Sequence, residues 1–167
     1  MSSITPCLMF PHSAEEAVNL YVSVIPNSSV REVTRYGEGA PLPAGTVLTI
    51  DFVLDGLPVL VINGGPGNPF TDAISLSISA DTQDEIDRMW DALIADGGAP
   101  GPCGWLTDKF GVSWQVVPPQ LETLLKDPDP ERAGRVMQAM MAMSKLNIAE
   151  LEAAAAGQAV GSAAQTN

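Results

Sequence analysis

The feature that most constrains this fold is an internal repeat, in which a strand, a helix and a group of later strands occur twice in the same order. Residues of the first strand and helix match later ones at an offset of 69 (75 − 6, 82 − 13): Pro6 with Ser75, Ser13 with Thr82, Glu16 with Glu85 and Tyr21 with Trp90. Further along the offset falls to 55 (111 − 56, 115 − 60), which pairs Gly56 with Gly111 and Leu60 with Gln115. The repeat predicts two βαβββ modules rather than one continuous sheet.

Local patterns place the elements within this repeat. Strands are predicted at residues 4–10, 30–36, 46–54 and 58–63 in the first copy and at residues 73–80, 104–106 and 113–117 in the second. Ser13 and Thr82 each precede a helix and are each followed three residues later by a glutamate, which indicates a capping box at both helices. Asp108 to Gly111 read as a hairpin turn, in which the glycine supplies a left-handed backbone angle.

The chain is predicted to change character after the second copy. Prolines 118 and 119 end the last strand, a short helix follows, and another helix begins at Pro130 after Asp129 as N-cap. Val136, Met137, Met140 and Met141 form a stripe on this helix that serves either as core or as a contact with a partner. We expect one domain over residues 1–152, with module one at 3–64, module two at 72–118, C-terminal helices at 119–152 and a flexible tail at 153–167.

Composition excludes several kinds of partner. The net charge is −12 with only eight Lys and Arg, so the chain should repel nucleic acid and anionic membrane surfaces. No apolar run approaches the roughly 20 residues of a membrane span, and the N-terminus has no secretory signal pattern. Cys7 and Cys103 lie far apart and in no CxxC pair, as is typical of a reducing compartment. We therefore expect a cytoplasmic protein without nucleic-acid or membrane partners.

The second copy carries an unusual set of polar strand residues. Ser75, Ser77 and Ser79 alternate with apolar residues, so the serines should share the face that points away from the helix. Gln115 should face the same way, because Trp114 and Val116 alternate to the other side. A buried amide needs a hydrogen-bond partner, which could be Ser75, a bound ligand, or neighbouring side chains and water.

Three further residues are candidates for a ligand pocket. Asp51 lies between Ile50 and Phe52 in a strand and serves either as a pocket acid or base or as a solvent-facing residue. Phe70 and Trp105 could wall a pocket, since small-molecule sites combine apolar walls with a few polar groups, or could pack in the core.

Other catalytic chemistry has little support in the sequence. No serine lies in a GxSxG motif, and Cys103 has only Lys109 nearby to favour a thiolate. A Rossmann-type methyltransferase is not expected, because VLVINGGPGNPF is interrupted by two prolines and is followed by a predicted strand instead of a helix.

Together these segments resemble the vicinal oxygen chelate superfamily, and within it the PhnB-like branch that is often labelled demethylubiquinone methyltransferase. The resemblance is carried by TPCLMF, AEEAVNLYVSVIPNS, TRYGEGAP, LDGLPVLVINGGP, CGWLTDKFGVSWQVVP and DPDPERAGRVMQAM. It implies an α+β fold of two tandem βαβββ modules that form a cup, as in glyoxalases, bleomycin-resistance proteins and dihydroxybiphenyl dioxygenases. It also implies a homodimer and four metal-ligand positions, which fall here on Pro6, Leu60, Ser75 and Gln115.

The residues at these four positions do not suit a metal. Proline and leucine have no donor atom, serine is a poor ligand, and one neutral glutamine amide does not hold a divalent ion. The single histidine, His12, is expected to be exposed in a loop, and Cys7 to point away from the cup. We expect a metal-independent small-molecule-binding protein without a cofactor. The alternatives are a metal-dependent glyoxalase or dioxygenase-type enzyme that uses Gln115 with Asp51 or His12, and a dimeric interaction protein.

Overall fold

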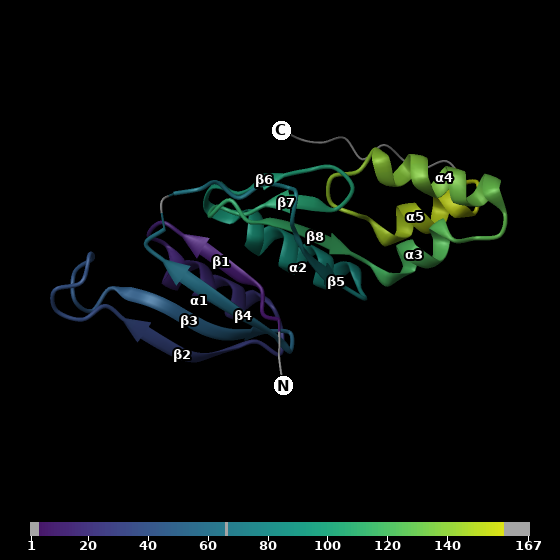
Figure 1. The fold of residues 1–167 in the computed structure, drawn as a ribbon. Coiled ribbons are helices and arrows are strands. Elements are labelled where there is room, and N and C mark those ends of the chain that lie inside the picture. The colour runs from purple at the N-terminus through teal and green to yellow at the C-terminus, as the bar shows by residue number, and fades with distance from the viewer. Residues whose placement is uncertain (1–3, 66, 159–167) are drawn as a thin grey trace. The chain divides into compact units, whose positions relative to one another are not determined.

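The computed structural model describes residues 4–65 and 67–158, and the chain divides into two compact units, of which one ends at Pro69 and the other begins at Phe70 (Figure 1). The first unit holds one helix and four strands: β1 (Cys7–Phe10), α1 (Ala14–Val24), β2 (Ser29–Arg35), β3 (Val47–Leu54) and β4 (Leu57–Asn63). Its sheet has the order β1-β4-β3-β2, in which β1 runs parallel to β4 and the other pairs are antiparallel.

The second unit begins with the same arrangement. Its elements are β5 (Leu76–Ser79), α2 (Gln83–Ile94), the short 3₁₀ helix η1 (Ala95–Gly97), β6 (Ala99–Pro100), β7 (Trp105–Thr107) and β8 (Ser113–Val117). The sheet order is β5-β8-β7-β6, with β5 parallel to β8 and the other pairs antiparallel. The prediction of two βαβββ modules is confirmed. Only β6 was not predicted, because a two-residue edge strand that ends in proline has no strand pattern to read.

The strand registers correct one detail of the repeat. Cys7 lies opposite Leu60 on β4, and Ser77 lies opposite Gln115 on β8. Since Leu60 and Gln115 are counterparts, Cys7 corresponds to Ser77, which is an offset of 70 (77 − 7). The pairing of Pro6 with Ser75 was therefore wrong by one residue. Counted from these counterparts, Cys7 precedes Ser13 by six residues (13 − 7) and Ser77 precedes Thr82 by five (82 − 77), and a shift of one residue moves a side chain to the other face of a sheet.

Each module buries one face of its sheet under its helix. In the first, α1 packs on β3 and β4 and buries Val18, Tyr21 and Val24. In the second, α2 packs on β7 and β8 and buries Ile86, Trp90 and Leu93. The buried strand residues on these faces include Leu8, Phe10, Ile50, Phe52, Val59 and Val61 in the first module and Leu106, Trp114 and Val116 in the second. The predicted alternation of Trp114 away from Gln115 is confirmed by this packing.

The two helices are capped differently. Thr82 Oγ1 accepts a hydrogen bond from the Glu85 amide at 3.3 Å, and the Glu85 carboxylate accepts one from the Thr82 amide at 3.1 Å, so this predicted capping box is confirmed. The box predicted at Ser13 was wrong, because the Ser13 side chain makes no capping hydrogen bond. The buried Asn63 of β4 takes its place: its Oδ1 accepts from the Ala14 amide at 3.3 Å.

The predicted turn at Asp108 is organised by a buried carboxylate. Asp108, which is 3% exposed, accepts hydrogen bonds from the amides of Phe110 at 2.9 Å and Val112 at 3.0 Å. Its other oxygen accepts from the indole Nε1 of Trp114 at 2.9 Å. Gly111 has the left-handed angle the turn requires, with φ of 90°. One carboxylate therefore fixes both the hairpin and the orientation of a core tryptophan.

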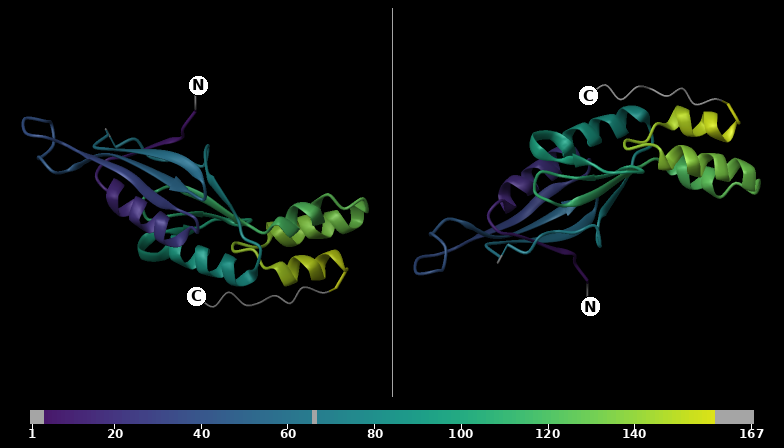
Figure 2. Two further views of the ribbon diagram at one scale, coloured as in Figure 1. Left: turned by 90° about the horizontal axis from the view of Figure 1, so that it is seen from below. Right: turned by 90° about the horizontal axis from the view of Figure 1, so that it is seen from above.

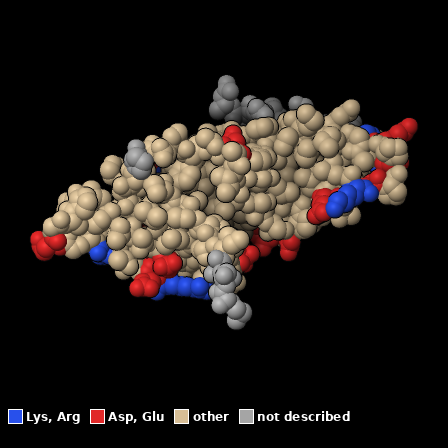
Figure 3. All heavy atoms as spheres, viewed as in Figure 1, with Lys and Arg blue, Asp and Glu red and all other residues tan. Residues whose placement is uncertain are grey.

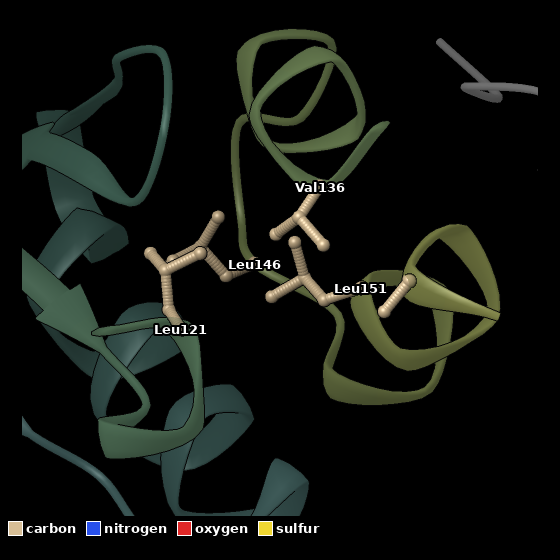
Figure 4. Packing of buried hydrophobic residues seen from close by; sticks show 5 residues of the cluster. Leu121, Val136, Leu146 and Leu151 are labelled. Atoms are coloured by element: carbon tan, nitrogen blue, oxygen red, sulfur yellow. The ribbon is translucent and has the colours of Figure 1, made fainter. Parts of the chain in front are cut away.

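Three helices follow the second module: α3 (Pro119–Leu125), α4 (Pro130–Met141) and α5 (Ile148–Ala155). They lie together beyond the end of β8 (Figures 1 and 2). Their side chains meet in a cluster formed by Leu121, Val136, Leu146, Leu151 and Ala155, four of which point toward one another in Figure 4. Helix α5 had not been recognised as separate. It continues past the predicted start of the tail at 153, with Ala154 and Ala155 buried; residues 159–167 lie outside the described part of the chain.

The methionine stripe of α4 lies partly in the core and partly at the surface. Val136 is fully buried and Met140 packs against the same cluster. Met137 is 42% exposed and Met141 is 66% exposed. One side of the stripe is therefore core, as expected, while the other side faces outward.

Candidate small-molecule site in the second module

The side of the second sheet that faces away from α2 carries the polar residues. In the strand register Ser77 and Trp105 both lie opposite Gln115, on the two sides of β8. Leu76 and Ile78 lie opposite Trp114 and Val116, which are buried toward α2. The strand pairing therefore places the serines and Gln115 on one face, as their alternation had indicated.

Two hydrogen-bonded side-chain pairs link this face to the segment before β5. Gln115 Nε2 donates to Ser75 Oγ at 2.8 Å. Two residues earlier on β8, Ser113 Oγ donates to Asp72 Oδ1 at 2.6 Å, and Ser113 is only 3% exposed. Ser75 is thus a partner of the Gln115 amide, one of the alternatives that the sequence left open. The two pairs hold residues 72–75 against the sheet.

A cavity of about 230 Å³ lies beside these pairs in the second unit. Its lining residues come from the segment before β5, the loop after β6 and strand β7: Asp72, Gly101, Pro102, Trp105, Leu106 and Thr107. Trp105 and Thr107 share the face of Gln115 and Ser113, because they lie opposite them in the register. The cavity is therefore mostly apolar, with an indole on one wall and the Asp72 carboxylate as its charged group.

Of the six predicted pocket residues, only Trp105 lines this cavity. Ser75, Ser77 and Gln115 lie on the same sheet face without lining it. Phe70 instead lies against the hairpin turn, where a Cβ on Gly111 would be 3.8 Å from its ring. Asp51 belongs to the first unit, where it is exposed on β3 opposite Glu32 and Leu60.

Asp72 is the functional candidate that sequence reasoning missed. It lies in the GNPFTD loop, where an acidic residue before a strand is ordinary turn chemistry. Its importance comes from the bond to Ser113, 41 residues away, which no local pattern reveals. Among the described residues no Lys, Arg or His forms a salt bridge with Asp72.

The four family ligand positions do not form a metal-binding donor set. Pro6 and Leu60 carry no donor atom, and the Ser75 hydroxyl and Gln115 amide are bonded to each other. Within residues 4–65 and 67–158, no group of three or more His, Cys, Asp or Glu is placed to hold a metal ion. His12 is exposed, in the loop before α1. The residues present do not fit a divalent metal.

One of the two cysteines lies on a different face from the one expected. Cys7 was expected to point away from the cup, but it lies opposite Leu60 on the face turned away from α1. It is exposed at the surface, and partial desolvation raises the pKa of its thiol, which disfavours the nucleophilic thiolate. Cys103 is half-buried in the loop beside the cavity.

Comparison with known proteins agrees with the fold and adds a family. Residues 2–117 match the family model described as 3-demethylubiquinone-9 3-methyltransferase. A PhnB protein from Bacillus cereus, described as belonging to that methyltransferase family, is 37% identical with a TM-score of 0.62, over 70% of this chain and 99% of its own. Protein PA1353 from Pseudomonas aeruginosa is 23% identical with a TM-score of 0.57, over 71% and 98% of the two chains.

A more distant structure has the same fold. The fosfomycin resistance protein FosX from Listeria monocytogenes, solved with Mn(II) and 1S,2S-dihydroxypropylphosphonic acid, is 16% identical with a TM-score of 0.54, over 75% of this chain and 99% of its own. A search of curated proteins found no match.

The paired βαβββ modules and these relatives define a protein of the vicinal oxygen chelate superfamily. Within that superfamily, the chain belongs to the PhnB-like family whose model carries the description 3-demethylubiquinone-9 3-methyltransferase. The match to the model ends at residue 117, the last residue of β8, so helices α3 to α5 lie beyond it. In the described part of the chain, no helix has the length and apolar character needed to cross a membrane.

Proposed function

We propose that this PhnB-like protein binds a small organic molecule without a metal, in the cavity of its second module. The observation that carries the proposal is the cavity itself, about 230 Å³ in volume, between the Trp105 indole and the Asp72 carboxylate. Its lining is that of a small-molecule site, with apolar walls and one polar group that can orient a ligand, and its volume, below the roughly 300–1,000 Å³ of pockets for drug-sized ligands, limits it to a small ligand.

The lining also suggests which ligands fit. Trp105 and Pro102 offer apolar surface to a ring or a short alkyl group. Asp72 offers a hydrogen-bond acceptor with a negative charge, so a donor group or a cation is favoured at that end, and an anion is repelled. A neutral or positively charged molecule with a flat apolar body is therefore the expected class.

Binding without metal is supported by the donor set. Gln115 Nε2 donates to Ser75 Oγ at 2.8 Å, which occupies the serine oxygen, and Leu60 and Pro6 have no side-chain donor atom to offer an ion. The methyltransferase description finds no support in the fold. Among the described residues the Gly-Gly pair after β4 is followed by no helix before strand β5, whereas a nucleotide-type methyltransferase site needs a helix that begins at the glycine loop.

We further propose that the protein is a cytoplasmic homodimer. Several large apolar side chains of the first module are more than a third exposed: Met9, Val30, Val33 and Leu57. Exposed apolar surface of this kind often marks a contact with another protein surface. On the face seen in Figure 3, charged side chains lie in small separate groups and the blue Lys and Arg atoms form no continuous stripe, which fits an acidic chain without a nucleic-acid partner.

The direct test is native mass spectrometry of protein purified without chelators, which reads the oligomer and any retained metal or ligand together. A metal-free dimer, alone or with an organic molecule bound, is the expected result. One metal ion per chain would contradict the proposal and favour a metal-dependent enzyme. A monomer would contradict only the proposal that the protein is a dimer. A metal-free dimer that binds none of the small organic molecules screened would favour an interaction protein.

A further inference from the structure

Residues 143–148, called the strap below, run from the connection after α4 to the first residue of α5 and lie against the loop that walls the cavity. The Cys103 amide donates to the Met143 carbonyl at 2.7 Å, and the Gly104 amide donates to the Ser144 carbonyl at 2.7 Å. Two successive amides of the wall are therefore bonded to two successive carbonyls of the strap. The neighbouring Gly101, Pro102 and Trp105 line the cavity.

The wall loop has a backbone that needs such support. Cys103 has a φ of 58° and Gly104 a φ of 85°, two left-handed residues in succession, and this region costs free energy for a residue with a side chain. Gly104 is also enclosed, because a Cβ there would lie 2.9 Å from the Val116 carbonyl oxygen and 3.0 Å from Leu146 Cδ1. The loop is thus fixed between strand β8 and the strap.

The other side of the strap is attached to α2. Gln83 Nε2 donates to the Leu146 carbonyl at 3.2 Å, and Gln83 Oε1 accepts from the Ile148 amide at 2.9 Å. Lys145 lies 2.9 Å from Asp87 and 3.3 Å from Asp91, both on α2. These bonds tie the strap to a helix whose position is set by the core of the module.

The strap is in turn part of the C-terminal cluster. The Leu146 side chain is fully buried there and points toward Leu121, Val136 and Leu151 (Figure 4). Packing of α3 to α5 thereby holds the strap, and the strap holds the cavity wall.

We infer that the C-terminal helices are a positioning element for the ligand cavity: through the strap they set the place of Gly101, Pro102 and Trp105. This inference rests on the proposed function in treating the cavity as the ligand site. The strap and helices α3 to α5 lie beyond the part matched by the family model, which ends at residue 117. The shape of the cavity in this chain is therefore controlled by a segment outside the shared family domain.

The test compares two leucines of the same cluster in the full-length chain. Leu146→Ala removes the side chain by which the strap packs into the cluster. Leu151→Ala removes the same side chain from α5, and both leucines are 0% exposed. Amide hydrogen exchange by NMR is measured at Cys103 and Gly104 and at β3 of the first unit. Leu146→Ala is expected to speed exchange at Cys103 and Gly104 by about tenfold more than Leu151→Ala does, without a change in β3.

A milder pair covers the case in which either leucine variant fails to fold. Gln83→Ala removes both side-chain bonds to the strap, and its control Gln120→Ala removes a bond from α3 to the Asp81 carbonyl. Gln83→Ala alone should speed exchange at Cys103 and Gly104 and shift the Trp105 indole signal. Equal effects of both variants, or no effect of either, would overturn the inference.

Titration with benzyl alcohol separates this inference from the proposed function. We expect the wild type to bind this probe, with a shift of the Trp105 indole signal, and Gln83→Ala to bind it several-fold more weakly than Gln120→Ala. Failure of the wild type to bind benzyl alcohol would contradict the proposal that the cavity is a ligand site. The role of the C-terminal helices in positioning a ligand would then fall with it. Probe binding that Gln83→Ala leaves unchanged would overturn the inference and leave the proposed function standing.

Discussion

The two modules have the same topology but carry different side chains on the faces their helices leave uncovered. In the first module three neighbouring strands place Cys7, Leu60 and Asp51 side by side on this face. In the second, Ser77, Gln115 and Trp105 occupy the matching places in the sheet. The faces under the helices, by contrast, are apolar in both. The fold is thus repeated through the covered faces, while the uncovered faces have diverged: the second module has an amide and an indole where the first has a leucine and an exposed carboxylate.

The largest effect should come from the hairpins, which the modules build differently. Asp108 is buried and accepts three hydrogen bonds, whereas Asp55 in the matching turn is exposed and contributes mainly its left-handed backbone. Asp108→Ala should lower the free energy of unfolding by about 3 kcal/mol or more, because buried donors lose their acceptor. Asp55→Ala should cost about 1 kcal/mol. Chemical denaturation of both variants measures the contrast, and equal losses would contradict it.

Helix capping should give the next largest difference. Thr82 caps α2 with its side chain, but the Ser13 side chain makes no capping bond to α1. Thr82→Ala should therefore destabilise the protein by about 1 kcal/mol. Ser13→Ala should be close to neutral, since Asn63 bonds the Ala14 amide instead. A comparable loss in both variants, measured by thermal unfolding, would show that Ser13 is a cap in solution.

The ion pair of the strap should have a smaller effect that depends on pH. Partial burial opposes the charge on Lys145, but hydrogen bonds to Asp87 and Asp91 outweigh it and raise the pKa of Lys145. Burial likewise opposes the charge on Asp87, and bonds to Lys145 and Gln83 outweigh it and lower its pKa. What Lys145 contributes to the stability of the fold is fully present below the ordinary pKa of lysine and is lost as the pH rises through its raised pKa. What Asp87 contributes to that stability is fully present above the ordinary pKa of aspartate and is lost as the pH falls through its lowered pKa.

Lys145→Met should therefore cost about 0.5 kcal/mol at neutral pH, because both groups are partly exposed to solvent. The difference from wild type should shrink in acid, once Asp87 is protonated, and in strong alkali, once Lys145 is neutral. Lys126→Met is the control, since its pair with Glu122 on α3 is exposed at 72% on both sides and should make no measurable contribution. A loss that is independent of pH would indicate lost packing instead.

The smallest expected effect is a change in ligand preference at Asp72. Benzylamine, benzyl alcohol and benzoate have the same ring and differ in charge. The cavity should bind benzylamine about threefold more tightly than benzyl alcohol and should bind benzoate least, because an exposed carboxylate contributes little. Asp72→Asn keeps an acceptor for Ser113 and should abolish the difference between the amine and the alcohol. Calorimetry or NMR titration measures the ratios, and unchanged ratios would exclude Asp72 from ligand contact.

The sequence predicted what depends on local pattern. The module order, the capping box at Thr82 and the turn at Asp108 follow from short-range spacing. The face shared by Ser77 and Gln115 follows from alternation, and the bond between Gln115 and Ser75 was one of several open alternatives.

The rest could not be predicted because it depends on contacts distant in the chain. The Ala14 cap comes from Asn63, 49 residues away, and the Ser113 bond reaches Asp72 across 41 residues. The offset of the first strands was misplaced by one, because only the pairing of β1 with β4 and of β5 with β8 shows which residues correspond. The strap was hidden because the helix predicted after Asp129 was read on to Lys145, past the observed end of α4 at Met141, and no local pattern marked α5.

The central claim is that the second module binds a small molecule without a metal. The most direct test is an NMR titration of EDTA-treated protein with benzylamine, with the Trp105 indole signal assigned from a Trp105→Phe variant. The account predicts that this signal shifts while those of Trp90, on the buried side of α2, and Trp114, in the strand beneath it, do not. It also predicts that added Zn²⁺ or Mn²⁺ leaves the affinity unchanged. Binding that appears only after metal is added, or that leaves the Trp105 signal in place, would contradict it.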